Sequence, residues 1–174
     1  MTWFITVFAF LFIAWGWVAL VGPPYIPVLR KDLRQAFDSL YKVSSKDVLL
    51  DLGSGDGTVL REAARRGAKA IGFEINPFLV LVSRFLGSGL DVETRVANAW
   101  TSRFPDDVTV VYVFADKRDA PKVSRIVQQE ALRLDKDITV ISYGFILPGL
   151  KKVSSMGAHH KFTASPKLLR SRSA

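Results

Sequence analysis

The stretch Val48-Leu49-Leu50-Asp51-Leu52-Gly53-Ser54-Gly55-Asp56-Gly57 joins a short apolar run to a turn that contains three glycines. An apolar run of this length that ends in glycines predicts a buried strand. The helical pattern of residues 58–66 follows at once, and Gly67 supplies its C-terminal stop. Glycines let the backbone turn tightly and approach a ligand closely because they lack a Cβ atom. The stretch therefore predicts a strand, a ligand-binding turn and a helix.

Strand and helix patterns alternate along the rest of the chain. Further strands are predicted over residues 70–74, 92–97, 108–114 and 138–143, and further helices over residues 31–41, 77–86 and 120–133. The Gly-, Ser- and Lys-rich remainder predicts one hairpin around residues 160–163. This alternation predicts an α/β fold with a Rossmann-like, mostly parallel sheet and helices on both faces. Ligands of such sheets bind beyond the carboxyl ends of the strands.

The second predicted strand ends in an acid that suits a nucleoside ligand. Glu74 lies 21 residues after Gly53, and a carboxylate there can accept hydrogen bonds from both hydroxyls of a ribose. The dinucleotide fingerprint G-x-G-x-x-G does not fit, because the third glycine, Gly57, comes one position early. The alternative is a purely structural glycine turn beside an unrelated surface acid.

The first 22 residues carry no charged side chain, and residues 3–21 form an apolar run broken only by Thr6 and Gly16. As a helix, these 19 residues would span about 28 Å, close to the roughly 30 Å of a bilayer's hydrocarbon core. The alternatives are a buried core helix and a cleaved signal peptide. We predict one membrane anchor. Because Arg30 and Lys31 follow it and no basic side chain precedes it, the remainder of the chain should lie on the cytoplasmic side.

Composition limits the other possibilities. The chain has 174 residues, no cysteine and only two histidines, the adjacent His159 and His160, which we expect at the surface. We therefore expect no metal site and no thiol nucleophile. The predicted organisation is an anchor over residues 1–22, a loop and helix over 23–46, a single domain over 47–164 and a basic tail over 165–174.

The pattern D-x-G-x-G-x-G over residues 51–57 resembles the first motif of class I S-adenosylmethionine-dependent methyltransferases. The resemblance implies that the glycine turn accommodates the methionine end of S-adenosylmethionine and that Glu74 holds its ribose. Asn98 stands where the family usually has an acid that binds adenine, and Trp100 packs either on the adenine or in the core. The implied cofactor-binding residues are Asp51, Leu52, Gly53, Ser54, Gly55, Gly57, Glu74, Ile75, Asn98, Ala99 and Trp100.

A finer resemblance covers roughly residues 20–115. Residues 24–27 (Pro-Tyr-Ile-Pro), the turn at 51–57 and residues 72–77 (Gly-Phe-Glu-Ile-Asn-Pro) are similar to the membrane-anchored lysine methyltransferases that modify the ATP synthase c-subunit or the adenine nucleotide translocase. This implies methyl transfer to a lysine of a membrane protein. The catalytic candidates to line the acceptor channel follow from position: Tyr25 lies in the loop before the domain, and Asp116 follows the fourth predicted strand, where the carboxyl end of a central strand faces the site. Ordinary packing or loop solvation is the alternative role for both. The alternatives are a small-molecule, lipid or RNA acceptor, and a non-catalytic cofactor-binding scaffold on the membrane.

Two further surfaces bear on partners. The segment from residue 150 to 174 holds six Lys or Arg residues and no acid, which favours contact with anionic lipid headgroups. Phe162 is its single aromatic residue, so base stacking is not indicated and we expect no nucleic-acid partner.

The helix predicted over residues 77–86 is apolar nearly all round, which indicates either a helix buried in the core or one that faces a bilayer or a membrane-embedded substrate.

Overall fold

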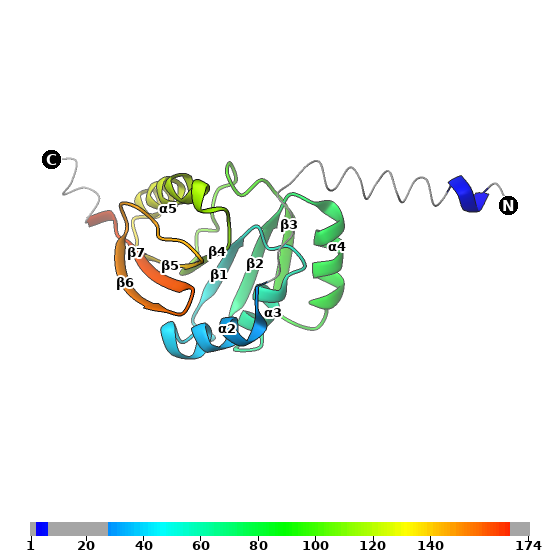
Figure 1. Ribbon diagram of the computed structural model, residues 1–174, viewed down its shortest axis with the longest axis horizontal. Coiled ribbons are helices and arrows are strands. Elements are labelled where there is room, and N and C mark those ends of the chain that lie inside the picture. Colours follow the sequence, from blue (N-terminus) through cyan, green and yellow to red (C-terminus); the bar gives the residue numbers. More distant parts are fainter. Residues whose placement is uncertain (1–2, 7–27, 168–174) are drawn as a thin grey trace.

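Seven strands form one mixed sheet in the computed structural model, which describes residues 3–6 and 28–167 (Figure 1). The sheet order is β3-β2-β1-β4-β5-β7-β6. The first five of these pair in parallel, β7 runs antiparallel to β5, and β6 runs antiparallel to β7. The strands are β1 Val48–Leu52, β2 Lys69–Glu74, β3 Val92–Val96, β4 Val110–Val113, β5 Ile138–Tyr143, β6 Lys151–Met156 and β7 His159–Ala164.

Helices cover both faces of this sheet, as the alternating pattern predicted. Helix α5 lies on one face, α2 and α3 lie on the other, and α4 lies beside β3 at the edge (Figure 1). Each face has its own buried cluster, with Val123 and Val127 of α5 in one and Leu60 and Ala63 of α3 in the other. Between residues 28 and 164 the helices are α2 Arg30–Gln35, the π-helical η1 Ala36–Leu40, α3 Thr58–Ala64, α4 Pro77–Leu86, the 3-10 helix η2 Lys117–Asp119 and α5 Ala120–Leu134.

Most predicted elements agree with the structure to within two residues at their ends. Helix α4 starts as its sequence predicts, because the Asn76 side chain accepts a hydrogen bond from Phe78 N at 3.0 Å and Pro77 occupies the first turn. The helix expected over residues 31–41 instead divides into α2 and η1. Leu33 and Phe37 of these two helices are fully buried, so they belong to the core on the α3 face. The predicted domain boundaries stay a prediction.

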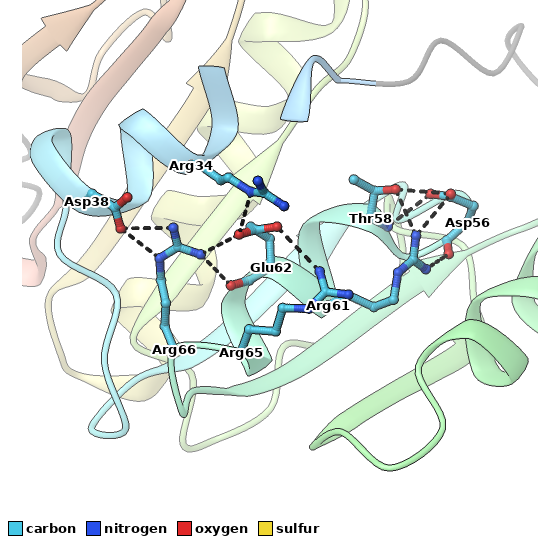
Figure 2. Close-up of polar contacts among 8 residues, drawn as sticks. All are labelled: Arg34, Asp38, Asp56, Thr58, Arg61, Glu62, Arg65 and Arg66. Atoms are coloured by element: carbon cyan, nitrogen blue, oxygen red, sulfur yellow. Dashed lines mark hydrogen bonds and ion pairs between the residues drawn. The ribbon is translucent and has the colours of Figure 1, made fainter. Parts of the chain in front are cut away.

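A buried carboxylate joins α2 and η1 to α3 (Figure 2). Glu62 of α3 accepts hydrogen bonds from Arg34 Nε at 3.2 Å and from Arg66 Nη1 at 2.8 Å. Arg66 also pairs with Asp38 of η1 at 2.9 Å. Burial by itself would raise the pKa of Glu62, but the hydrogen bonds from the two arginines outweigh it and the pKa is lowered. The segment ahead of β1 is thus fixed to the helix that follows the glycine turn.

The structure corrects one expectation and argues against one of the two alternatives given for the helix over residues 77–86. His159 is 1% exposed rather than a surface residue, because β7 pairs with β5 and brings its Nε2 to 3.1 Å from the Tyr112 hydroxyl. Helix α4 is not buried in the core, because Phe78, Leu81 and Phe85 are 63%, 62% and 81% exposed.

The predicted anchor over residues 1–22 lies outside the described residues except for residues 3–6, which are helical. Tyr25 and the end of the predicted basic tail also lie outside them. Across residues 3–6 and 28–167, no helix combines the length and apolarity needed to cross a membrane.

Candidate active site

Four parallel strands end level with one another, which brings the predicted site residues to one edge of the sheet. Leu52 of β1 pairs with Phe73 of β2 and with Val113 of β4, and Glu74 pairs with Val96 of β3. The sheet order reverses between β1 and β4, because β1 continues to β2 on one side and β4 to β5 on the other. The carboxyl edge at such a switch point is where open α/β sheets bind their ligands.

The glycine turn is bonded to the neighbouring strand. The amides of Gly53 and Ser54 both donate to Phe73 O, at 2.9 and 3.0 Å. Gly53, Gly55 and Gly57 have φ values of 87°, 54° and 77°, in the left-handed region that favours glycine. No atom lies within 4 Å of the place where a Cβ on Gly53 would stand, so the turn offers open space there. A ligand can therefore approach the backbone at Gly53.

The glycine turn is also held in place by close packing against β2 and α4. A Cβ at Gly72 of β2 would overlap Ser54 Oγ and would lie 2.6 Å from Leu60 Cδ1 and 2.7 Å from Ser54 Cβ. A Cβ at Gly57 would overlap Ser83 Oγ of α4. Both glycines are thus required for the close approach of the turn, α3 and α4 to one another.

A buried arginine also fixes the turn, and its role is not evident from the sequence. Arg61 is 5% exposed and donates to the backbone oxygen of Asp56, to Asp56 Oδ2 at 3.2 Å and to Thr58 Oγ1 at 2.9 Å (Figure 2). Asp56 Oδ1 in turn accepts from Thr58 N at 2.9 Å. In the sequence, Arg61 is one of several basic residues in and around α3, and nothing in its spacing separates it from the solvated ones.

Glu74 faces the glycine turn. Its Oε2 accepts from Gly55 N at 2.9 Å, its Oε1 accepts from Asn76 N at 2.8 Å, and the residue is 8% exposed. Each carboxylate oxygen has two lone pairs, so one on each oxygen remains for a ligand after the backbone is satisfied. This arrangement fits a vicinal diol such as that of a ribose.

Asp51, in β1 two residues before Gly53, is a second acid near the turn and is more deeply buried than Glu74. It is 3% exposed, and its β1 position pairs with Gly72 of β2. Burial raises its pKa well above the ordinary value, and the negative charges of Glu74 and Asp56 raise it further. Asp51 therefore holds its proton more strongly than an exposed aspartate does, whereas the sequence showed only an acid two positions before the first glycine.

The other predicted cofactor residues lie at the same edge, on and after β2 and β3. Ile75 is 45% exposed, next to Glu74. Asn98 is exposed, and its Oδ1 accepts from Trp100 N at 2.9 Å. Trp100 and Ala99 pack against the cluster on the α5 face, with Lys122 Nζ 4.4 Å from the centre of the tryptophan ring. The structure thus gives Trp100 a contact with the core.

Asp116 follows β4, and its carboxylate is bonded to the neighbouring Arg118. Its side chain accepts from Arg118 N and caps η2, and Arg118 Nη2 lies 2.8 Å from its Oδ2. The hydrogen bonds from Arg118 lower the pKa of Asp116 to about 2, which makes this carboxylate a poor proton acceptor. Its catalytic role, like that of Tyr25, stays a prediction.

An aromatic cluster occupies the ends of β4 and β5. The Phe114 and Tyr143 rings meet edge-on with centroids 4.9 Å apart, and Tyr143 lies 4.7 Å from the His159 ring. Burial lowers the pKa of His159 to about 4.

In the part of the chain that the structure describes, no three His, Asp or Glu side chains gather as a metal ion would require.

Comparison with known proteins identifies the family. The model of the ANTKMT methyltransferase domain family matches residues 51–154, which is more than half of the chain. The lysine N-methyltransferase of the ATP synthase c-subunit from Xenopus laevis is 32% identical over 111 residues, which are 62% of this chain and 48% of that protein. The human protein of the same name is 28% identical over 129 residues, which are 72% of this chain and 53% of that protein. The chain thus spans about half the length of these curated relatives.

Among solved structures, an RNA methyltransferase from Salinibacter ruber in complex with S-adenosyl-L-homocysteine superposes with a TM-score of 0.70. It is 28% identical, and the match covers 80% of this chain and 94% of that one. The resemblance to class I S-adenosylmethionine-dependent methyltransferases, which rested on the glycine turn and Glu74, is thereby confirmed. The chain belongs to the family of the ANTKMT methyltransferase domain.

Proposed function

We propose that this chain binds S-adenosylmethionine at the carboxyl edge of its sheet and transfers the methyl group to a lysine side chain of a membrane protein. The observation that carries the proposal is the closed arrangement of Glu74 and the glycine turn, in which Gly55 N donates to Glu74 Oε2 at 2.9 Å. This arrangement leaves one lone pair on each Glu74 oxygen for the two hydroxyls of a ribose, and it leaves open space beside Gly53 through which a ligand can approach. The S-adenosyl-L-homocysteine in the Salinibacter ruber structure and the lysine methyltransferase relatives support it.

The residues present fit this cofactor part by part. Glu74 would accept from the ribose hydroxyls, and the backbone of the glycine turn would receive the methionine end, whose carboxylate suits the amides at the start of α3. Ile75 and the segment from Asn98 to Trp100 would border the adenine. When bound, S-adenosylmethionine supplies an electrophilic methyl group on a sulfonium.

The chain's own contribution to methyl transfer is alignment and exclusion of water, because an in-line displacement needs little covalent chemistry from the enzyme. The lysine must arrive neutral, and burial at the mouth of the site lowers the pKa of an amine toward that state. Phe114 and Tyr143 supply apolar surface for such burial, since both pack at the ends of strands that border the site. No step requires Asp116 to accept a proton.

We further propose that residues 1–22 anchor the chain in a membrane as a single span, with the domain on the cytoplasmic side. The uncharged apolar run over residues 3–21 and the following Arg30 and Lys31 support this. The basic residues from 151 onward would add attraction to anionic lipids. An anchor raises the effective concentration of substrates confined to the same membrane and does little for soluble ones.

An RNA acceptor is the second candidate. The Salinibacter ruber protein is named an RNA methyltransferase, and this chain carries a net charge of +8. The predicted anchor favours the protein substrate, and so does the burial of Phe162, the single aromatic residue of the basic segment, which leaves no exposed ring there for base stacking. A non-catalytic scaffold fits less well, because Asp51, the three glycines and Glu74 are all present and the turn is bonded to Glu74.

The experiment compares the full chain with a version lacking residues 1–21, using S-adenosylmethionine labelled in its methyl group and isolated membranes. We expect both to bind S-adenosyl-L-homocysteine equally in calorimetry, and the full chain to label membrane protein far more. The difference should shrink when the substrate is solubilised in detergent. Equal labelling of membranes by both would refute the role of the anchor, and absence of cofactor binding in the folded full chain would refute the site.

A further inference from the structure

Helix α4 turns its large apolar side chains away from the protein. Phe78, Leu81, Phe85 and Leu86 are 63%, 62%, 81% and 46% exposed, and we call these four residues the α4 apolar face. The buried residues of the same helix are Val80 and Ser83, which face the sheet. An ordinary surface helix has the opposite arrangement, with its apolar stripe toward the core and its polar residues outward. Contiguous exposed apolar surface of this kind marks an interaction site.

Polar contacts fix this inverted orientation. Ser83 Oγ and Thr94 Oγ1 of β3 share a buried hydrogen bond of 2.7 Å. Arg84, the single charged residue of α4, donates from Nε and Nη2 to Thr94 O at 2.9 and 2.7 Å. The helix therefore uses its polar groups to attach to the edge of the sheet, and its outer surface carries no charge other than an arginine that is already bound to β3.

The chain enters the domain at Val28, on the sheet face that α2 and α3 cover, and α4 adjoins the start of α3. Val28 packs in the same buried cluster as Val59 in the first turn of α3. Gly57, just ahead of that turn, is in close contact with Ser83 of α4. The six residue steps from residue 22 to residue 28 reach at most about 20 Å. An anchor that ends at residue 22 therefore holds Val28, where the chain enters the domain, within about 20 Å of the bilayer.

We propose that the α4 apolar face rests on the lipid bilayer, in the boundary between headgroups and acyl chains. This inference rests on the proposed anchor. A surface of flexible leucines and phenylalanines, whose one neighbouring charge on the helix is Arg84 bonded to Thr94 O, fits lipid, because burial at that boundary requires apolar area and no matched hydrogen bonds. Helix α4 begins directly after Asn76, whose amide reaches Glu74, so a helix lying on the membrane places the mouth of the site at the interface.

The test uses the absence of cysteine from the chain, which allows one labelled cysteine at a chosen place. Phe85→Cys reports on the α4 apolar face, and its high exposure lets the label be added without disturbing the core. Leu132→Cys is the matched control, since Leu132 is an exposed leucine on α5, which covers the opposite face of the sheet from α3. Phe10→Cys reports on the anchor. Each full-length chain carries an environment-sensitive fluorophore and is reconstituted into vesicles with or without brominated lipid.

We expect brominated lipid to quench the labels at positions 10 and 85 and to leave the label at position 132 unchanged. Quenching at position 10 without quenching at position 85 would overturn the proposal while the anchor stands. If position 85 is instead shielded only when the chain is concentrated, a second copy covers the face and the proposal is wrong. Absence of quenching at position 10 would overturn the anchor and this proposal together, independently of any methyl transfer.

Discussion

Replacing Glu74 with glutamine should damage both the fold and the cofactor site, because this carboxylate serves two backbone donors. Its oxygens accept from Gly55 N at 2.9 Å and from Asn76 N at 2.8 Å in a site that is 8% exposed. A glutamine presents one oxygen and one NH₂ group. One of the two backbone N–H groups would therefore face the NH₂ group, which is also a hydrogen-bond donor, and would lose its acceptor. Leaving a buried amide unpaired costs about 1–3 kcal/mol.

Two measurements on the full-length chain in detergent separate these effects. The thermal midpoint of Glu74→Gln should fall by about 2–4 °C for each kcal/mol lost. In calorimetry, S-adenosyl-L-homocysteine should bind at least about tenfold more weakly, since each 1.4 kcal/mol lost with the ribose hydrogen bonds is a factor of ten. Glu93→Gln is the control, because Glu93 is an exposed carboxylate of β3 paired with Arg95. If Glu74→Gln melts and binds as the unmodified chain does, the ribose-holding role of Glu74 is wrong.

Three further outcomes follow from the same geometry. Gly72→Ala should cost about 1–3 kcal/mol by overpacking against Ser54, and chemical denaturation should show part of that cost recovered when Ser54→Gly is added. Arg61→Met should raise the KM for S-adenosylmethionine more than it lowers kcat, because the arginine fixes the turn at Asp56 and touches no reacting atom; an unchanged KM would contradict this. Burial lowers the pKa of His159 from 6.5 to about 4, so between these pH values the unfolded chain binds a proton at this residue that the folded chain does not. The free energy of unfolding therefore keeps its full value above pH 6.5 and falls by up to about 3 kcal/mol as the pH drops toward 4. His159→Gln should flatten the pH dependence of stability over that window, and an unchanged slope would show that His159 is not the group responsible.

Local signals in the sequence predicted the elements that position the site. The strand β1, the glycine turn and α3 follow one another without interruption, and the cap formed by Asn76 and Pro77 marks the start of α4. These features depend on residues close together in the chain, so composition and spacing are enough to identify them. The proximity of Glu74 to the turn followed from the rule that parallel strands share one carboxyl edge.

Features that depend on distant partners could not be predicted in the same way. The burial of His159 requires β7 to pair with β5, and its polar sequence gives no sign of that pairing. The outward face of α4 depends on Ser83 meeting Thr94, whereas the helix sequence is apolar nearly all round and favours no side. Arg61 is distinguished from its basic neighbours only by its contacts with Asp56 and Thr58.

The most direct test of the account is the chemical identity of the methylated product. Full-length chain is incubated with membranes and S-adenosylmethionine labelled in its methyl group, and the labelled material is separated into protein, lipid and RNA before complete hydrolysis of the protein fraction. The account predicts that the label is recovered as methylated lysine from an integral membrane protein and that it disappears with Glu74→Ala. Label in the lipid or RNA fraction, or in a soluble protein, would contradict it.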